Sequence, residues 1–113
     1  MSEDTDEYYA RAVEFVRARW DEGEAIARGA DGELEPWTVS DAGNVTAYDK
    51  RLIASVWIQN ARHIAHFDPA HVLADIAAKR AALDFVVDEY PYVAILFAQP
   101  FVDHPDFDPA WRV

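Results

Sequence analysis

Histidines and carboxylates are the side chains in this sequence whose spacing could support chemistry. His63 and His66 are three residues apart, so they would share a face on a helix. Two imidazoles and a carboxylate can bind zinc or a similar divalent ion, and His104 and Asp106 offer further ligands from a distant part of the chain. The alternative is structural, with Asp68 capping a helix and the histidines making ordinary polar contacts. Because the sequence contains no HExxH pattern, we favour the structural interpretation.

Other catalytic patterns are missing from the sequence. It has no glycine-rich phosphate loop, no nucleophile elbow and no Walker-type lysine. It also has no cysteine, which excludes a disulfide framework, a thiolate zinc site and a cysteine nucleophile. We therefore predict a protein that is not an enzyme and needs no cofactor, with a metal-dependent enzyme that uses the histidines as the alternative.

The charge distribution bears on possible partners. The formal net charge of −11 opposes direct binding to nucleic acid or to anionic lipid. Residues 45–83 are mildly basic, with three acids against five bases, and include a basic and aromatic patch of Lys50, Arg51 and Arg62 with Trp57 between them. This patch is the candidate surface for a protein partner. A further hypothesis, which rests on charge alone, is an acidic mimic of nucleic acid that inhibits a DNA-binding protein.

The first half of the chain predicts a long helix followed by a hairpin. Ser2 or Thr5 can cap a helix over residues 5–28. Its apolar stripe consists of Tyr9, Ala12, Val13, Val16 and Trp20. Residues 37–40 and 45–48 are typical of two strands joined by a turn at Gly43-Asn44. Residues 52–58 fit either a third strand or the start of a helix, and we predict a helix over residues 54–66.

The second half predicts two further helices and an ordered C-terminal strap. Asp68 is a favoured N-cap and Pro69 suits the first helical position, so a helix should run from here to about Tyr90. Pro91 separates it from a short buried helix over residues 92–98, which Pro100 ends. The tail is rich in turn residues but contains Phe107 and Trp111, so it should pack onto the core.

These elements predict an α+β, mainly α fold. It has three longer helices, one short buried helix, a small β-hairpin and the strap, in a single globular domain over residues 1–113. No apolar run approaches the ~20 residues of a membrane-spanning helix, and the acidic N-terminus is unlike a signal peptide. We therefore expect a cytoplasmic protein without membrane contact.

Three segments of the chain resemble a family of short actinobacterial and actinophage proteins known as domain of unknown function 6221. They are residues 15–28, residues 61–80 and residues 97–112, and the Asp-His-Pro-Asp-Phe sequence before Trp111-Arg112 is their most specific part. Many relatives carry a longer insertion before the third segment, sometimes with cysteines. Here that stretch is short and has no cysteine, so a metal site built on the insertion does not apply. The resemblance implies a host range and no activity.

The sequence thus leads to a non-enzymatic protein-binding or regulatory module of actinobacterial or actinophage origin. The missing catalytic patterns, the acidic surface and the aromatic residues beyond those a core needs support this interpretation.

Overall fold

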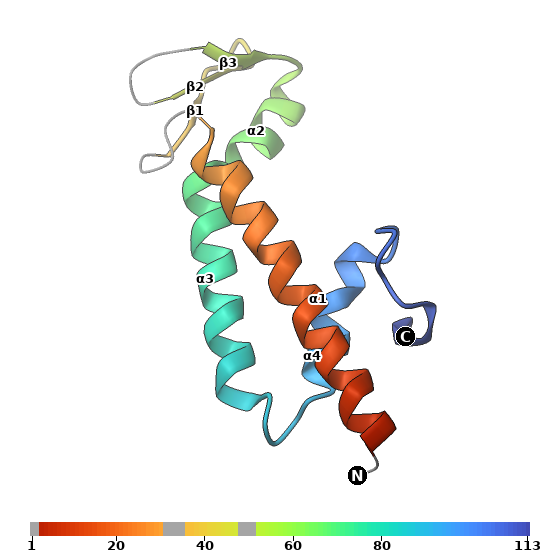
Figure 1. Ribbon diagram of the computed structural model, residues 1–113. Coiled ribbons are helices and arrows are strands. Elements are labelled where there is room, and N and C mark those ends of the chain that lie inside the picture. Colours follow the sequence, from red (N-terminus) through yellow and green to blue (C-terminus); the bar gives the residue numbers. More distant parts are fainter. Residues whose placement is uncertain (1–2, 31–35, 48–51) are drawn as a thin grey trace. The chain divides into compact units, whose positions relative to one another are not determined.

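The computed structural model describes residues 3–30, 36–47 and 52–113, with side chains from Asp6 onward (Figure 1). The chain divides into two compact units. Unit 1 takes the chain up to Glu22 together with Ala78–Val113, and unit 2 takes Gly23–Ala77. The expectation of a single domain stays a prediction.

Helix α1 (Glu3–Arg28) confirms the first predicted helix. Its stripe buries Ala12, Val16 and Trp20, whereas Arg11, Glu14, Arg17 and Asp21 on the other face are exposed. The helix ends where the Gly29 N–H donates to the Ala25 carbonyl (3.1 Å). Thr5 lies inside the helix and is not its cap, and Ser2, the other predicted cap, lies outside the described residues.

Unit 2 contains a three-stranded antiparallel sheet in the order β1-β2-β3. The predicted hairpin is confirmed as β1 (Thr38–Val39) and β2 (Asn44–Thr46), with Val39 opposite Val45. Gly43 in the turn has a φ of 83°, a conformation that residues with a Cβ rarely adopt. Val45 is fully buried and anchors the sheet in the core of the unit.

The predicted helix over residues 54–66 is wrong at its start. Leu52–Ser55 forms β3, so the alternative of a third strand is correct there, and helix α2 is Ile58–His66. The hydrogen bonds of β2 decide this, because Val45 pairs with Ala54 and the Val56 N–H donates to the Gly43 carbonyl (3.1 Å). A short apolar run suits both structures, and the available sheet edge selects the strand.

Helix α3 is Pro69–Val86, four residues shorter than predicted. The Tyr90 N–H donates to the Val86 carbonyl (2.7 Å) and closes its last turn, and Pro91 follows. In unit 2, Gly23 of α1 lets Ile76 of α3 come close, since a Cβ at Gly23 would lie 3.1 Å from Ile76 Cδ1. Further buried apolar residues among those described in this unit are Ala27, Val45, Ala47, Ala61 and Pro69.

The C-terminal strap of unit 1 is ordered, as predicted. Helix α4 (Val93–Ala98) ends before Pro100, as predicted, and is followed by 3-10 turns at Gln99–Phe101 and Pro109–Trp111. Phe107 and Trp111 are buried against Phe15, with ring centroids 6.0 and 5.2 Å from it. The Gln99 amide donates to the Trp111 carbonyl (2.7 Å) and fixes the end of the strap.

The fold class is therefore α+β and mainly α, with the hairpin enlarged to three strands. Among the helices that the structure describes, none combines the length and the apolar character needed to cross a bilayer.

Candidate interaction surface

Helix α2 is held by one face and leaves the other to solvent. Ala61 is fully buried, and the helix packs on β1 and β2. Arg62, His63 and His66 are exposed. Trp57, the residue before the helix, accepts the Ala61 N–H with its carbonyl (2.9 Å), while its side chain is 81% exposed. An indole this exposed contributes little to the core, so it is available for contact with a partner.

The corner between α2 and α3 is built by Asp68. One carboxylate oxygen accepts the His71 N–H (2.8 Å), which makes Asp68 the N-cap of α3, with Pro69 at the first helical position. The other oxygen accepts the Trp37 N–H (2.9 Å) from the segment before β1. The predicted cap is confirmed, and it also joins the helix corner to the sheet.

Phe67 projects from this corner and is surrounded by imidazoles. Its side chain is 51% exposed, and its ring centroid lies 5.0 Å from that of His63, 4.9 Å from that of His66 and 5.5 Å from that of His71. The rings of His66 and His71 are 5.0 Å apart. We call the exposed side chains of this region the α2 surface: Trp57, Arg62, His63, His66, Phe67 and His71.

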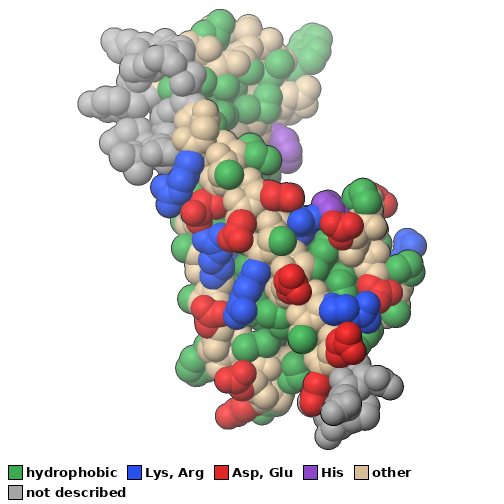
Figure 2. All heavy atoms as spheres, viewed as in Figure 1, with side chains coloured by type: hydrophobic (Ala, Val, Ile, Leu, Met, Phe, Trp, Pro, Cys, Tyr) green, Lys and Arg blue, Asp and Glu red, His purple; other side chains and the backbone are tan. Residues whose placement is uncertain are grey.

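The α2 surface has a local charge unlike that of the rest of the chain. From residue 57 to residue 74 the only carboxylate is that of Asp68, which is buried and bonded through both oxygens to backbone N–H groups. Elsewhere, Asp and Glu side chains gather along α1 and the C-terminal segment, on the face drawn in Figure 2. In a chain of net charge −11, the α2 surface thus presents an arginine and three histidines without an exposed acid.

An apolar pocket of about 300 Å³ adjoins the α2 surface and shares Phe67 with it. Ile26, which is 75% exposed, stands at its edge. The residues that line the pocket are Gly23, Ile26, Ala27, Ala30, Trp37, Phe67, Pro69 and Val72. This volume is at the lower end of the ~300–1,000 Å³ typical of ligand pockets, which suits a single large apolar side chain.

The predicted metal ligands fall into different units. His63 and His66 lie on α2 in unit 2, whereas His104 and Asp106 lie in the strap of unit 1. Within the described ranges, no group of three or more His, Asp or Glu side chains is placed to hold a metal ion. Of the partner-binding candidates, Trp57 and Arg62 both belong to the α2 surface, and Lys50 lies outside the described residues.

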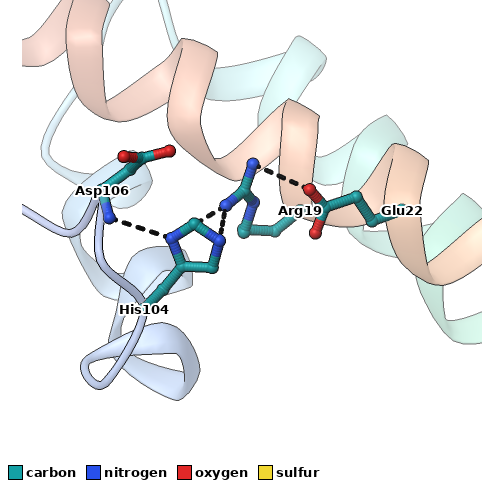
Figure 3. Close-up of polar contacts among 4 residues, drawn as sticks. All are labelled: Arg19, Glu22, His104 and Asp106. Carbon is teal, nitrogen blue, oxygen red and sulfur yellow. Dashed lines mark hydrogen bonds and ion pairs between the residues drawn. The ribbon is translucent and has the colours of Figure 1, made fainter.

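His104 and Asp106 are in contact in unit 1 (Figure 3). The sequence suggested both residues as metal ligands, but it did not predict their contact with Arg19. The Asp106 N–H donates to His104 Nδ1 (3.0 Å), and Arg19 Nη1 lies 2.9 Å from the same nitrogen and also contacts Nε2. A guanidinium and a backbone N–H can only donate, so the His104 ring acts as the acceptor, with Nδ1 accepting the Asp106 N–H. These contacts give His104 a structural role.

Arg19 is the residue that sequence reasoning missed. Its side chain is only 10% exposed, pairs with Glu22 (3.1 Å) and stacks on Phe15, with Cζ 5.1 Å from the ring centroid. Arg19 lies in the first segment of the family resemblance and His104 in the third. Their presence in shared segments was the one feature of the sequence that could have pointed to both residues. Only the fold shows that Arg19 and His104 are in contact.

A wider hollow of about 630 Å³ lies along α1 in unit 1, lined by Val13, Arg17, Asp21, Val87 and others. Two of its charged residues form ion pairs, Arg17 with Asp84 (2.9 Å) and Asp21 with Arg80 (2.6 Å). We regard these pairs as links between α1 and α3 within the unit.

Comparisons with known proteins place the chain in a family without assigning it an activity. A family model described as a family of unknown function, DUF6221, matches residues 9–113. Comparison with curated proteins and with solved structures gives no significant match.

Proposed function

The chain belongs to the family of unknown function DUF6221, and we propose that it acts as a non-enzymatic protein-binding or regulatory module. The proposal includes a cytoplasmic setting. It also includes an actinobacterial or actinophage origin, supported by the resemblance of the three shared segments.

The α2 surface is the observation that carries the proposal. Trp57 and Phe67 expose large rings at the two ends of α2, and Arg62 is exposed on the helix between them. Aromatic residues and arginine are the types enriched at the energetic centres of protein interfaces. The surface has no exposed carboxylate, so an acidic partner surface would meet no like charge there. The partner is thus a protein with an acidic contact face.

A comparative capture experiment tests the proposal. The immobilised parent protein and a Trp57→Ala, Arg62→Ala variant are incubated with an actinobacterial lysate, and retained proteins are identified by mass spectrometry. The matched control is Arg112→Ala, Val113→Ala, which removes an exposed arginine and an exposed apolar residue from unit 1. We expect partners that the parent and the control retain and the α2-surface variant loses. Equal capture by all three proteins would overturn the proposal.

A titration with zinc separates this function from the metal-dependent enzyme. An ion that binds only the folded state at 100 times its dissociation constant adds about 2.7 kcal/mol, a melting shift on the order of 10 °C in a domain of this size. We expect no shift with zinc and none with a chelator. A zinc-dependent rise that disappears in His63→Ala, His66→Ala would favour the enzyme instead.

A further inference from the structure

One segment of this chain has the chemistry that the α2 surface and its pocket would recognise. Phe85, near the end of α3, is 89% exposed. Leu83, two residues earlier, is fully buried, so Phe85 lies on the opposite, outward face of the helix. Asp84, Asp88 and Glu89 around it are all exposed. We call Asp84–Glu89 the Phe85 segment. It presents one large apolar side chain with exposed acidic residues on both sides of it in the sequence.

The Phe85 segment is also firmly positioned. The Val87 N–H donates to the Leu83 carbonyl (2.9 Å), and the Glu89 N–H donates to the Val86 carbonyl (3.2 Å). A presented side chain on an ordered backbone loses little conformational freedom when it is bound. An exposed phenylalanine gains more from burial than most other side chains, because its ring is large and wholly apolar.

The pocket has the complementary properties. It is lined by apolar groups, among them Ile26, Val72 and Phe67, and its volume of about 300 Å³ can take one aromatic ring. On the side of the pocket formed by Phe67, the rings of His63, His66 and His71 surround that residue, and Arg62 is exposed on α2, four residues before His66. The acidic side chains that flank Phe85 therefore meet opposite or neutral charge there.

We propose that the α2 surface binds a second copy of this chain, with Phe85 of one copy in the apolar pocket of the other and with Asp88 and Glu89 facing Arg62 and the histidines. This inference rests on the proposed function, since it names one partner of the same surface. The donor segment and the acceptor surface are different patches, so the contact is heterologous, and every copy carries one of each. A single inserted side chain with a charged rim makes a small interface, of the kind found in weak, transient association.

Analytical ultracentrifugation tests the contact on the full chain at low salt, from roughly 10 μM to 1 mM, the range in which weak interfaces dissociate. The weight-average mass of the parent should rise with concentration. Phe85→Ala removes the inserted ring, and Ile26→Glu places a negative charge at the edge of the pocket, so each should remain a monomer. Val113→Ala, which also shortens an exposed apolar side chain, should behave as the parent does. Circular dichroism checks that each variant is folded.

Mixing the two monomeric variants gives the decisive result. Phe85→Ala retains an intact pocket and Ile26→Glu retains an intact Phe85, so an equimolar mixture can form one contact and should yield a 1:1 heterodimer. Neither an unfolded variant nor a contact through other surfaces gives this pattern. A parent that is monomeric at every concentration, an associating Phe85→Ala variant, or a mixture that stays monomeric would each overturn the inference.

The outcomes also separate this inference from the proposed function. If the parent is monomeric but captures partners that depend on Trp57 and Arg62, only self-association is wrong. If the capture experiment shows no dependence on these residues, the proposed function falls, whatever mass the parent has.

Discussion

The carboxylate of Asp68 accepts the backbone N–H of Trp37, 31 residues earlier in the chain, at 2.9 Å. With its other oxygen it accepts the His71 N–H and caps α3. One side chain therefore fixes both the start of a helix and the segment that leads into β1. Asp68 is the only Asp or Glu from residue 57 to residue 74, and its side chain is buried. The α2 surface therefore exposes basic side chains and no acid.

Asp68→Ala should consequently cost more than the loss of a helix cap. The cap contributes about 0.5–2 kcal/mol and a second hydrogen bond about 0.5–1.5 kcal/mol, so we expect a loss of about 1–3.5 kcal/mol in the free energy of unfolding. Urea denaturation measures it. Asp68→Asn keeps one oxygen acceptor and should fall between the parent and the alanine variant. An alanine variant as stable as the parent would contradict the cap and the link to Trp37.

Gly43→Ala should destabilise the sheet of unit 2. Its φ of 83° disfavours any residue with a Cβ, and that atom would collide with the Val56 carbonyl oxygen, which lies on the backbone and cannot rotate away. Gly29→Ala is the matched control, because its Cβ would meet the nearest atom at an ordinary 3.5 Å. Thermal melts should show a clear decrease for Gly43→Ala and little change for Gly29→Ala. The turn assignment fails if the two variants melt alike.

Trp111→Ala should severely destabilise unit 1. The indole is buried and contacts the rings of Phe15 (5.2 Å) and Phe107 (5.5 Å). Truncating a core tryptophan typically costs about 3–5 kcal/mol. Val113→Ala, two residues further on and largely exposed, should leave stability within about 0.5 kcal/mol of the parent. Chemical denaturation of both variants checks this, and equal stabilities would show that the strap is dispensable.

Tyr8 should make stability depend on pH in the alkaline range. Partial burial, and next the negative charge of Asp108, raise the pKa of the Tyr8 phenol above its usual value, and its hydroxyl donates to the Ala110 carbonyl (3.0 Å). The unfolded chain therefore loses this proton first. The contribution to stability is complete below about pH 10, the ordinary phenol pKa, and is lost as the pH rises through the raised pKa of the folded state.

The comparison of the parent with Tyr8→Phe isolates this effect, because all other titrating groups are common to both proteins. The difference between their free energies of unfolding should be constant from pH 7 to about pH 9. At higher pH the parent should lose stability relative to Tyr8→Phe. A difference that stays constant up to pH 11 would show that the phenol is not perturbed.

Local signals in the sequence determined much of this protein. The spacing of Ala12, Val16 and Trp20 specified α1, and Asp68-Pro69 specified the start of α3. Gly43 marked the hairpin turn, and Phe107 and Trp111 marked an ordered strap. These features depend on contacts within a few residues, or on the need of a large apolar side chain for burial, so the sequence alone expresses them.

The remaining features depend on partners that lie far away in the chain. Residues 52–55 became a strand because β2 offered an unpaired edge, and the sequence of that run suits a helix as well. Sequence reasoning noted Trp57 and Arg62, but not that Phe67 stands exposed among three histidines beside an apolar pocket. Nor could it place Arg19 against His104, 85 residues later. Long-range contacts such as these are fixed by tertiary packing, because no local spacing encodes which distant side chain will fill a given space.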